Sequence, residues 1–147
     1  MLRPVDQMDT RFLRDMLRHA YHWRLGDPDL PVYRYVKNWG RRGDAGVIAS
    51  AGPNAYGAAW YRLFTEREPG FGFVDAQTPE LTIAVVPSRR GKGAGKELLE
   101  ALLERAREDG YAAISLSASP EQTAYYERFG FETVRESEHA VTMLARL

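Results

Sequence analysis

Residues 89–96 place three glycines at alternate positions among four cations, a pattern suited to binding an anion. The stretch lies between an apolar run and a long amphipathic pattern, so we expect it to be the turn from a strand into a helix. The first N–H groups of a helix have no intrahelical partner and carry a partial positive charge. The glycines let phosphate oxygens approach these amides, while Arg90, Lys92 and Lys96 add positive charge. The turn therefore predicts a pyrophosphate site; the alternative is an ordinary turn with a solvated basic cap.

Pro87 is expected to mark the point where strand pairing fails. It ends the apolar run of residues 80–86, and proline has no N–H to donate to a β-ladder. If the next strand, residues 112–117, diverges at this end, the backbone groups of Val85 and Val86 are left for an extended amide ligand. The alternative is that Pro87 only ends the strand.

The elements around this turn alternate between short strand patterns and amphipathic helical patterns. Leucines at helical spacing predict a helix over residues 91–109. Apolar residues at positions 12–21 show helical spacing too, and Gly26-Asp27-Pro28 is expected to end that helix. A weaker pattern predicts a helix at residues 30–39, and a further helix is expected at residues 120–129. Strands are expected at residues 2–5, 47–50, 56–64, 80–86, 112–117, 131–136 and 139–145.

This order of elements predicts an α/β (α+β) fold, with a mixed, mostly antiparallel central sheet of about seven strands flanked by about four helices. The strand–helix–strand run of residues 80–117 implies one parallel pair, splayed at the ligand site. Gly52-Pro53-Asn54 predicts the turn of a hairpin. Residues 65–79 are irregular and rich in proline and glycine, and a loop of this length is expected to be functional, for example by covering a site.

The composition narrows the class of protein. The chain has 147 residues, with 20 basic and 20 acidic side chains and no cysteine, which suits one domain over residues 1–147. Balanced charge gives no global attraction to nucleic acid or anionic lipid, so neither is expected as a partner. The lack of cysteine excludes a disulfide scaffold and a thiol nucleophile, and the three histidines lack ligand spacing, so no metal is expected. No apolar run is long enough to span a bilayer, and we expect a cytoplasmic protein.

Two motifs give the chain a resemblance to a known family. Residues 90–95, Arg-Gly-Lys-Gly-Ala-Gly, are similar to the Arg/Gln-x-x-Gly-x-Gly/Ala pyrophosphate motif of the GNAT superfamily of acetyl-CoA-dependent N-acetyltransferases. Residues 125–131, Tyr-Tyr-Glu-Arg-Phe-Gly-Phe, resemble the family's aromatic-Tyr-x-x-x-Gly-Phe segment. The motifs occur in the family's order with the expected elements between them, which is more specific than either alone. The resemblance implies the family's fold over nearly the whole chain.

The resemblance also implies a cofactor site, with acetyl-CoA as the cosubstrate. It assigns pantetheine amides to the backbone of Val85 and Val86. The pyrophosphate is assigned to the turn, with Arg90 beside the phosphates and the amides of Gly91, Lys92, Gly93, Ala94, Gly95 and Lys96 around them. Ser119 stands where many members have an asparagine that binds the pantetheine arm. Ser119-Pro120-Glu121-Gln122 is also a capping box, so the serine either contacts the ligand or caps its own helix.

Helical spacing separates the residues of this last helix into two faces. Ser119, Gln122 and Tyr126 recur on one face, whereas Tyr125 and Phe129 form a pair that is expected to enter the core. Gln122 replaces the alanine that is usual in the family, four residues before the tyrosine. Gln122 is thus a departure from the family's pattern on the same helix face as Tyr126.

Acyl transfer to an amine requires a neutral nucleophile, a polarised thioester carbonyl and a proton for the departing thiolate. Tyr126 is the expected general acid, because a phenol keeps its proton at pH 7; the alternative is a packed helix aromatic. Glu80 is the first candidate for the base, since strand alternation places it with Thr82 and Ala84 on a face that can carry it toward the cleft. The alternative is that Glu80 is a surface residue and that Asp75 or a water accepts the proton.

Acceptor specificity is expected to come from the first helices, the hairpin and the irregular loop. The candidate residues are Tyr21, His22, Trp23, Arg24, Trp60, Arg62, Phe64, Phe71, Phe73 and Asp75. An aromatic wall with one carboxylate would suit a small amine, whereas Arg24 or Arg62 would receive a substrate carboxylate. The residues alone do not choose between these acceptors.

The leading hypothesis is an N-acetyltransferase that passes acetyl from acetyl-CoA to a primary amine of a small molecule or peptide, by direct attack in a ternary complex. The alternative is a non-catalytic module that binds or senses acyl-CoA. Terminal strands, if exposed, would support a homodimer.

Overall fold

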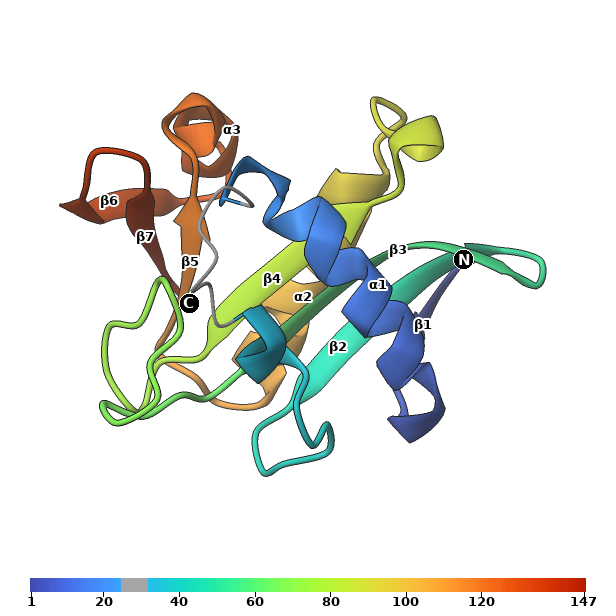
Figure 1. The fold of residues 1–147 in the computed structure, drawn as a ribbon, viewed down its shortest axis with the longest axis horizontal. Helices are drawn as coiled ribbons and strands as arrows, with labels where there is room; N and C mark the ends of the chain where they lie inside the picture. The colour runs from blue at the N-terminus through green and yellow to red at the C-terminus, as the bar shows by residue number, and fades with distance from the viewer. Residues whose placement is uncertain (25–31) are drawn as a thin grey trace.

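The computed structural model describes residues 1–24 and 32–147, which form a sheet with helices on both faces (Figure 1). The strands are β1 (Leu2–Pro4), β2 (Ala45–Ala51), β3 (Asn54–Arg62), β4 (Glu80–Val85), β5 (Ala113–Ala118), β6 (Phe131–Glu136) and β7 (Val141–Arg146). Their order in the sheet is β1-β2-β3-β4-β5-β7-β6. All neighbouring strands are antiparallel except β4 and β5. The predicted mixed, mostly antiparallel sheet of seven strands is confirmed.

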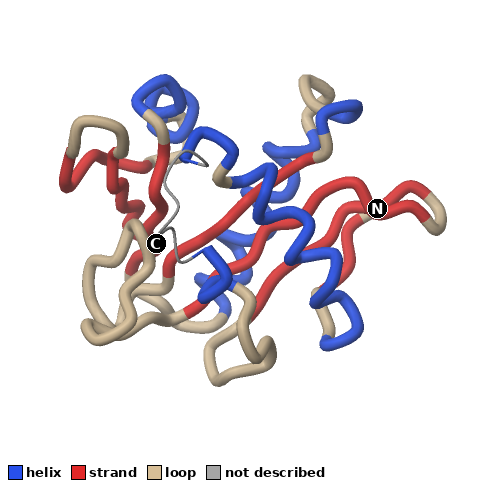
Figure 2. Tube along the Cα trace, viewed as in Figure 1, coloured by secondary structure: helices blue, strands red, loops and turns tan. Residues whose placement is uncertain are grey.

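The helices differ from the prediction in number and in bounds. The described residues contain three α-helices, α1 (Thr10–Ala20), α2 (Ala94–Glu108) and α3 (Thr123–Glu127), together with the 3₁₀ helices η1 (Gln7–Asp9), η2 (His22–Arg24), η3 (Val32–Tyr35), η4 (Pro87–Arg89) and η5 (Pro120–Gln122). Figure 2 shows these short helices between the strands and loops. The described part of residues 30–39 thus forms η3 and turns instead of a fourth α-helix. The predicted break at Gly26-Asp27-Pro28 lies outside the described residues.

The bounds of α2 follow from its glycines. Gly91 and Gly93 have φ of 79° and 84°, which lie far from the helical range, so α2 begins at Ala94 rather than at residue 91. The strand bounds agree with the predicted ones to within two residues at every end. Local sequence patterns therefore locate the strands well, whereas the start of this helix depends on backbone conformations that glycine permits.

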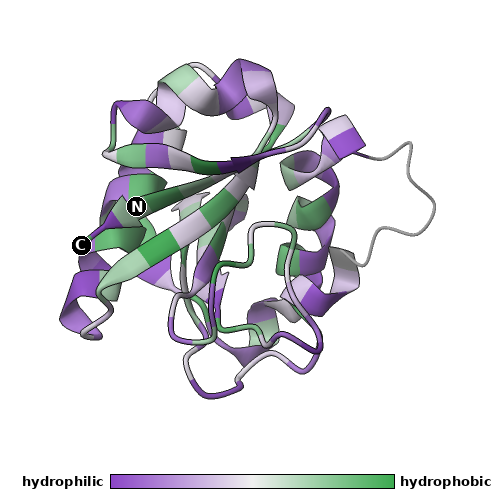
Figure 3. Cartoon of the chain, turned by 90° about the vertical axis from the view of Figure 1, so that its left-hand side faces the viewer, coloured by the Kyte–Doolittle hydropathy of each residue, from purple (hydrophilic) through white to green (hydrophobic). Residues whose placement is uncertain are grey.

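The two faces of the sheet are covered by different helices. α1 packs against β3 and β4 and buries Leu13, Met16 and Leu17. α2 packs on the opposite face, against β2, β3 and β4, and buries one side of the helix, namely Ala94, Leu98, Leu99, Leu102, Leu103 and Ala106. Figure 3 shows hydrophobic and hydrophilic residues alternating along the helices that cover the sheet. The amphipathic pattern of each helix thus decides which side is buried.

The parallel pair of strands is joined at one position only. Glu80 lies opposite Ser115, and Ser115 N donates to Pro79 O at 2.9 Å. Beyond this point β4 stays paired with β3 as far as Val85, while β5 follows β7. Figure 1 shows β4 and β5 diverging, with α3 at the far end of β5. The strands therefore separate toward the end that Pro87 marks, as the sequence predicts.

β1 and β6 form the two edges of the sheet, and β6 is exposed along its length after Phe131. Such an edge is available for pairing with another chain, but the expected homodimer stays a prediction. No helix among the described residues is both long enough and apolar enough to cross a membrane.

Candidate active site

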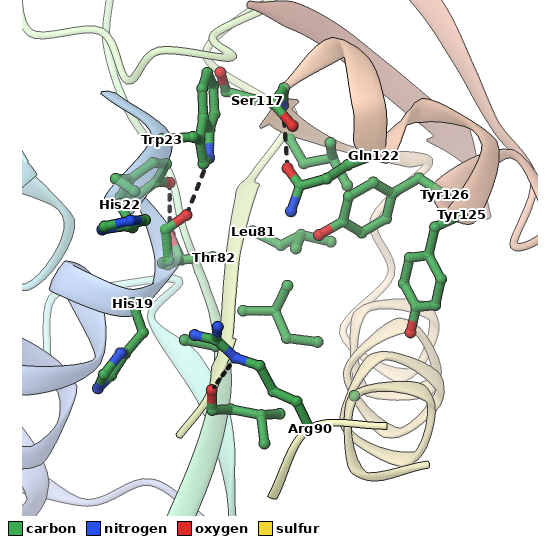
Figure 4. A pocket seen from close by; sticks show the side chains of 18 residues that line it. His19, His22, Trp23, Leu81, Thr82, Arg90, Ser117, Gln122, Tyr125 and Tyr126 are labelled. Atoms are coloured by element: carbon green, nitrogen blue, oxygen red, sulfur yellow. Dashed lines mark hydrogen bonds between the residues drawn. The ribbon is translucent and has the colours of Figure 1, made fainter. Parts of the chain in front are cut away.

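A cavity of about 440 Å³ opens where β4 and β5 separate. Its walls come from β4, from the end of β5, from the end of α1 with η2, and from η5 with α3. Arg90 and Gly95 line the side nearest the start of α2 (Figure 4). A concave site of this size, with a few polar groups from several elements, is typical of small-molecule binding. The divergence of the parallel strands thus creates a cavity rather than a packed core.

Tyr126 lines this cavity from α3. Its ring packs edge to face against Phe131, with ring centroids 5.9 Å apart, and the side chain is 8% exposed. Figure 4 shows the hydroxyl directed into the cavity. Burial raises the pKa of Tyr126 well above its usual value, so the phenol holds its proton at neutral pH. The residue predicted as the general acid therefore faces the cavity in the protonated form.

Ser119 and Gln122 line the cavity beside Tyr126, so the predicted shared face is confirmed. Gln122 Oε1 accepts a hydrogen bond from Ser119 N at 3.1 Å, which stabilises the start of η5. The expectation that Tyr125 enters the core is wrong: its side chain is 36% exposed, packs at a tilt against Phe129 with ring centroids 5.2 Å apart, and also lines the cavity. Tyr126 takes the buried position because it packs on Phe131 of β6.

The edge of β4 presents backbone groups to the cavity. Val86 N donates to Tyr56 O on β3 at 2.9 Å, so Val85, one residue earlier in the alternating ladder, turns its own backbone groups toward the gap. Arg90 Nε donates to Val85 O at 2.9 Å across that gap. The prediction that the backbone of Val86 is left for a ligand is wrong, because its C=O also accepts from Arg89 N at 3.0 Å.

The glycine-rich turn has the backbone shape that an anion site needs. A Cβ added to Gly91 or Gly93 would meet no atom, so the space beside both residues is open. The first helical hydrogen bond of α2 runs from Glu97 N to Gly93 O at 3.1 Å. The amides of residues 94–96 come before this bond and have no intrahelical acceptor. With the helix dipole and the exposed cations of the turn, they form a positive surface next to the cavity.

Glu80 lies on the predicted face of β4 but does not line the cavity. Its carboxylate is buried, with Tyr35 Oη donating to Oε2 and Gly72 N donating to Oε1 at 3.0 Å. Burial raises the pKa of Glu80 to about 7, although these hydrogen bonds oppose the rise. The expectation that Glu80 reaches the cleft itself is therefore corrected.

The hydroxyls of Thr82, Tyr21 and Tyr35 lie between this carboxylate and the cavity, and the sequence analysis did not single out Thr82 or Tyr35. Thr82, two residues after Glu80 on the same face, lines the cavity, and its Oγ1 lies 3.1 Å from Tyr21 Oη. The ring of Tyr21 lies beside that of Tyr35, with centroids 5.1 Å apart. The alternation of β4 was the available signal for Thr82, whereas Tyr35 comes from η3, far away in the sequence.

The irregular loop of residues 65–79 covers Glu80 rather than the cavity mouth. A Cβ on Gly70 would lie 2.3 Å from Glu80 Oε1, so only glycine allows the loop to pass there. Ser115 Oγ donates to Gly72 O at 2.8 Å and holds the same loop against β5. Asp75 is exposed and lines a different hollow, next to Arg105. Asp75 is therefore not placed to act as the base, which corrects the alternative expectation.

The candidate acceptor residues divide into a cavity wall and a core. Tyr21, His22 and Trp23 line the cavity, and His19 joins them. Arg24 lies beside this wall, 3.4 Å from Ser117 Oγ and over the ring of Phe71 at 4.1 Å. Trp60 and Phe64 are buried in the core that faces α1.

Arg62 is a structural residue, not a receptor for a substrate carboxylate. Its guanidinium is buried and pairs with both oxygens of Asp44, at 2.9 and 2.7 Å. It also donates to Arg34 O at 2.9 Å and to Lys37 O at 2.7 Å. Arg62 does not line the cavity, so of the two arginines considered as carboxylate receptors only Arg24 lies beside the proposed acceptor wall.

Comparison with known proteins decides the family. The model of the acetyltransferase (GNAT) family matches residues 10–131. The chain belongs to this family. The family resemblance inferred from the two motifs is thereby confirmed, and both motifs lie within or at the end of the matched residues. No curated protein is similar enough to count as a relative of this GNAT chain.

Solved structures share the GNAT fold at low sequence identity. The ribosomal-protein-alanine N-acetyltransferase of Brucella melitensis has a TM-score of 0.74 and 22% identity, covering 100% of this chain and 99% of that one. The yncA protein of Salmonella typhimurium, solved with its cofactor acetyl-CoA, has a TM-score of 0.71 and 20% identity over 100% and 93%. The paia N-acetyltransferase of Thermoplasma acidophilum, in complex with coenzyme A, has a TM-score of 0.68 and 13% identity, covering 100% of this chain and 98% of that one. These likenesses establish the fold.

Proposed function

We propose that this GNAT protein transfers the acetyl group of acetyl-CoA to a primary amine of a small molecule or peptide, by direct attack within a ternary complex. The observation that carries the proposal is the continuity between the cavity at Val85 and the positive turn at the start of α2. The open strand edge suits an extended amide chain, and the turn suits a pyrophosphate. Acetyl-CoA contains both parts, and two proteins of this fold were solved with acetyl-CoA or coenzyme A.

The residues of the turn fit this cosubstrate. The amides of residues 91–96 would surround the pyrophosphate, and Val85 would pair with an amide of the pantetheine arm. Arg90 Nε holds Val85 O in this structure, so an amide that takes the carbonyl has to displace the guanidinium. The displaced side chain then lies beside the phosphates, where its charge is favourable.

Tyr126 is proposed to protonate the leaving group. Acetyl-CoA supplies the acetyl group as a thioester. As the amine nitrogen bonds to the carbonyl carbon and the C–S bond breaks, the phenol donates its proton to the sulfur, and solvent restores the proton afterwards. The raised pKa keeps Tyr126 protonated until this step. A backbone N–H near Val85 would polarise the carbonyl.

Glu80 is proposed to act as a remote base. An alkylamine has a pKa of about 10.4 and has to lose a proton before it attacks. The carboxylate does not touch the cavity, but the hydroxyls of Thr82, Tyr21 and Tyr35 lie between the cavity and Glu80. Each hydroxyl can accept one proton and pass on another, so the proton ends on the carboxylate. A pKa of about 7 suits a group that gains and releases a proton near neutral pH.

Replacing Tyr126 with phenylalanine tests the proposed function. Acetyl-CoA binding is measured by calorimetry, and turnover is measured by thiol release with a panel of primary amines. We expect the wild-type chain to bind acetyl-CoA and acetylate at least one amine. Tyr126→Phe should keep the affinity but lose turnover by about a hundredfold or more, because one proton donor is removed.

The matched control is Tyr111→Phe, which removes a hydroxyl that lines the other hollow. It should leave binding and turnover unchanged. Binding of acetyl-CoA without turnover on any amine would instead support the non-catalytic sensing module. No detectable binding at saturating acetyl-CoA would overturn the whole proposal.

A further inference from the structure

We propose that Gln122 is a positioning residue, which donates a hydrogen bond from its side-chain N–H₂ group to a carbonyl oxygen beside the thioester sulfur. The inference rests on the proposed function, because it takes acetyl-CoA as the ligand of the cavity. Gln122 ends η5, immediately before α3, and lines the cavity together with Ser119 and Tyr126.

The orientation of Gln122 is fixed by its contact with Ser119. Ser119 N donates to Gln122 Oε1 at 3.1 Å. A backbone N–H needs an acceptor, so Oε1 and not Nε2 has to lie against it. Nε2 and its two N–H donors therefore point away from the helix start, and Figure 4 shows this nitrogen directed into the cavity. None of the hydrogen bonds found among the described residues uses Nε2.

The spacing from Tyr126 indicates which part of the ligand meets this donor. Gln122 and Tyr126 are four residues apart on one helical face, which separates their Cβ atoms by about 5–6 Å. Tyr126 is the proposed proton donor to the sulfur. Two carbonyls flank that sulfur, the acetyl carbonyl directly bonded to it and the first pantetheine amide four bonds away, about 5 Å in an extended chain. A donor one helical turn from Tyr126 therefore lies within reach of a carbonyl oxygen.

The N–H₂ group of Gln122 and a carbonyl oxygen of the ligand are chemically complementary. An amide N–H₂ has only donors to offer, and a carbonyl oxygen has only lone pairs. Gln122 is exposed, so its donors bind water when the cavity is empty, and exchanging that water for a carbonyl oxygen should add about 1 kcal/mol to binding.

Gln122→Glu removes the side-chain N–H₂ donor but keeps an oxygen that accepts from Ser119 N. The carboxylate still accepts from Ser119 N, so melting temperature should not fall, but it cannot donate to a carbonyl. We expect affinity for acetyl-CoA, measured by calorimetry, to drop about tenfold, equivalent to about 1.4 kcal/mol. Gln122→Met, which is uncharged, should lose the same affinity and also melt at a lower temperature, because Ser119 N loses its acceptor.

Ligands that lack parts of acetyl-CoA show which carbonyl accepts the hydrogen bond from Gln122. Affinity for 3′-phospho-ADP, which has the phosphates but no arm, should be unchanged in both variants. A loss shared by acetyl-CoA and free coenzyme A assigns the contact to the pantetheine amide, and a loss confined to acetyl-CoA assigns it to the acetyl carbonyl. The matched control is Glu121→Gln, an exposed neighbour that does not line the cavity, and its affinities should equal those of the wild type.

The outcomes distinguish this inference from the function on which it rests. If the wild-type chain does not bind acetyl-CoA, the proposed function fails. If the wild type binds acetyl-CoA and Gln122→Met binds it equally well, the function stands and the role of Gln122 is refuted. An equal loss for 3′-phospho-ADP would also refute it, because that ligand has no carbonyl to receive the hydrogen bond.

Discussion

Glu80 has a buried carboxylate that accepts hydrogen bonds from Tyr35 Oη and Gly72 N among the residues that the structure describes. Burial disfavours the charged form and raises its pKa to about 7, while the bonds from Tyr35 and Gly72, and then the charges of Arg135 and Arg24, act in the opposite direction. In the unfolded chain the same group has its usual pKa of 4.5. The difference between the two states links the stability of the fold to pH.

We expect this link to lower the free energy of unfolding as pH rises. Folded Glu80 binds its proton more tightly than unfolded Glu80, so the contribution is complete below pH 4.5 and is lost as pH rises through about 7. The shift corresponds to about 3 kcal/mol. Urea denaturation at about pH 5 and about pH 8 measures the loss, and Glu80→Gln, which does not titrate, should show a smaller one. An equal pH dependence in the variant and the wild type would contradict the assignment.

At the scale of elements, the turn before α2 needs a left-handed backbone and open space beside its amides, and glycine provides both. Gly93 is the N-cap of α2 and has a left-handed backbone, which places the amides of residues 94–96 at the open end of the helix. Gly110 follows the last residues of the same helix, and its φ of 86° is nearly the same as the 84° of Gly93. The helix therefore has a left-handed glycine at each end, and only one of them lies near the cavity.

This pair of glycines gives a matched test of the anion site. Gly93→Ala and Gly110→Ala should each destabilise the fold by about 1–2 kcal/mol, because alanine is strained at positive φ and neither new Cβ would meet another atom. Only Gly93→Ala should also weaken acetyl-CoA binding. Thermal melting and calorimetry measure the two effects. A similar loss of affinity in both variants would mean that general destabilisation, and not the turn, controls binding.

At the scale of the whole molecule, a buried ion pair attaches residues 34–44 to the sheet. Arg62 of β3 pairs with Asp44 and donates to two carbonyls of the same segment, Arg34 O and Lys37 O. That segment includes Tyr35, which holds Glu80. The pair therefore connects β3 with the segment whose Tyr35 contacts Glu80.

Removing one partner should destabilise the whole fold. Asp44→Ala leaves the Arg62 guanidinium buried without its counter-ion, which is expected to cost about 3–5 kcal/mol. The comparison variant is Glu104→Ala, which breaks an exposed pair with Arg107 and should cost no more than about 0.5 kcal/mol. Equilibrium denaturation of both variants measures the difference. Similar small losses in the two variants would show that the buried pair is not a structural anchor.

The sequence by itself determined the features that depend on local pattern. Alternation and helical spacing located every strand to within two residues and placed Ser119, Gln122 and Tyr126 on one face. Pro87 marked the end where the parallel strands separate. These features follow from backbone geometry and from side chains a few residues apart, and such information is complete within a short stretch of sequence.

Only the tertiary structure decided which of the correctly placed side chains reach the cavity. Glu80 and Thr82 share one face of β4, yet Glu80 is enclosed by Tyr35 and the loop at Gly72, while Thr82 is open to the cavity. Arg62 is likewise occupied by Asp44, 18 residues before it. The partners come from distant parts of the chain, and periodicity within one element contains no information about what packs against it.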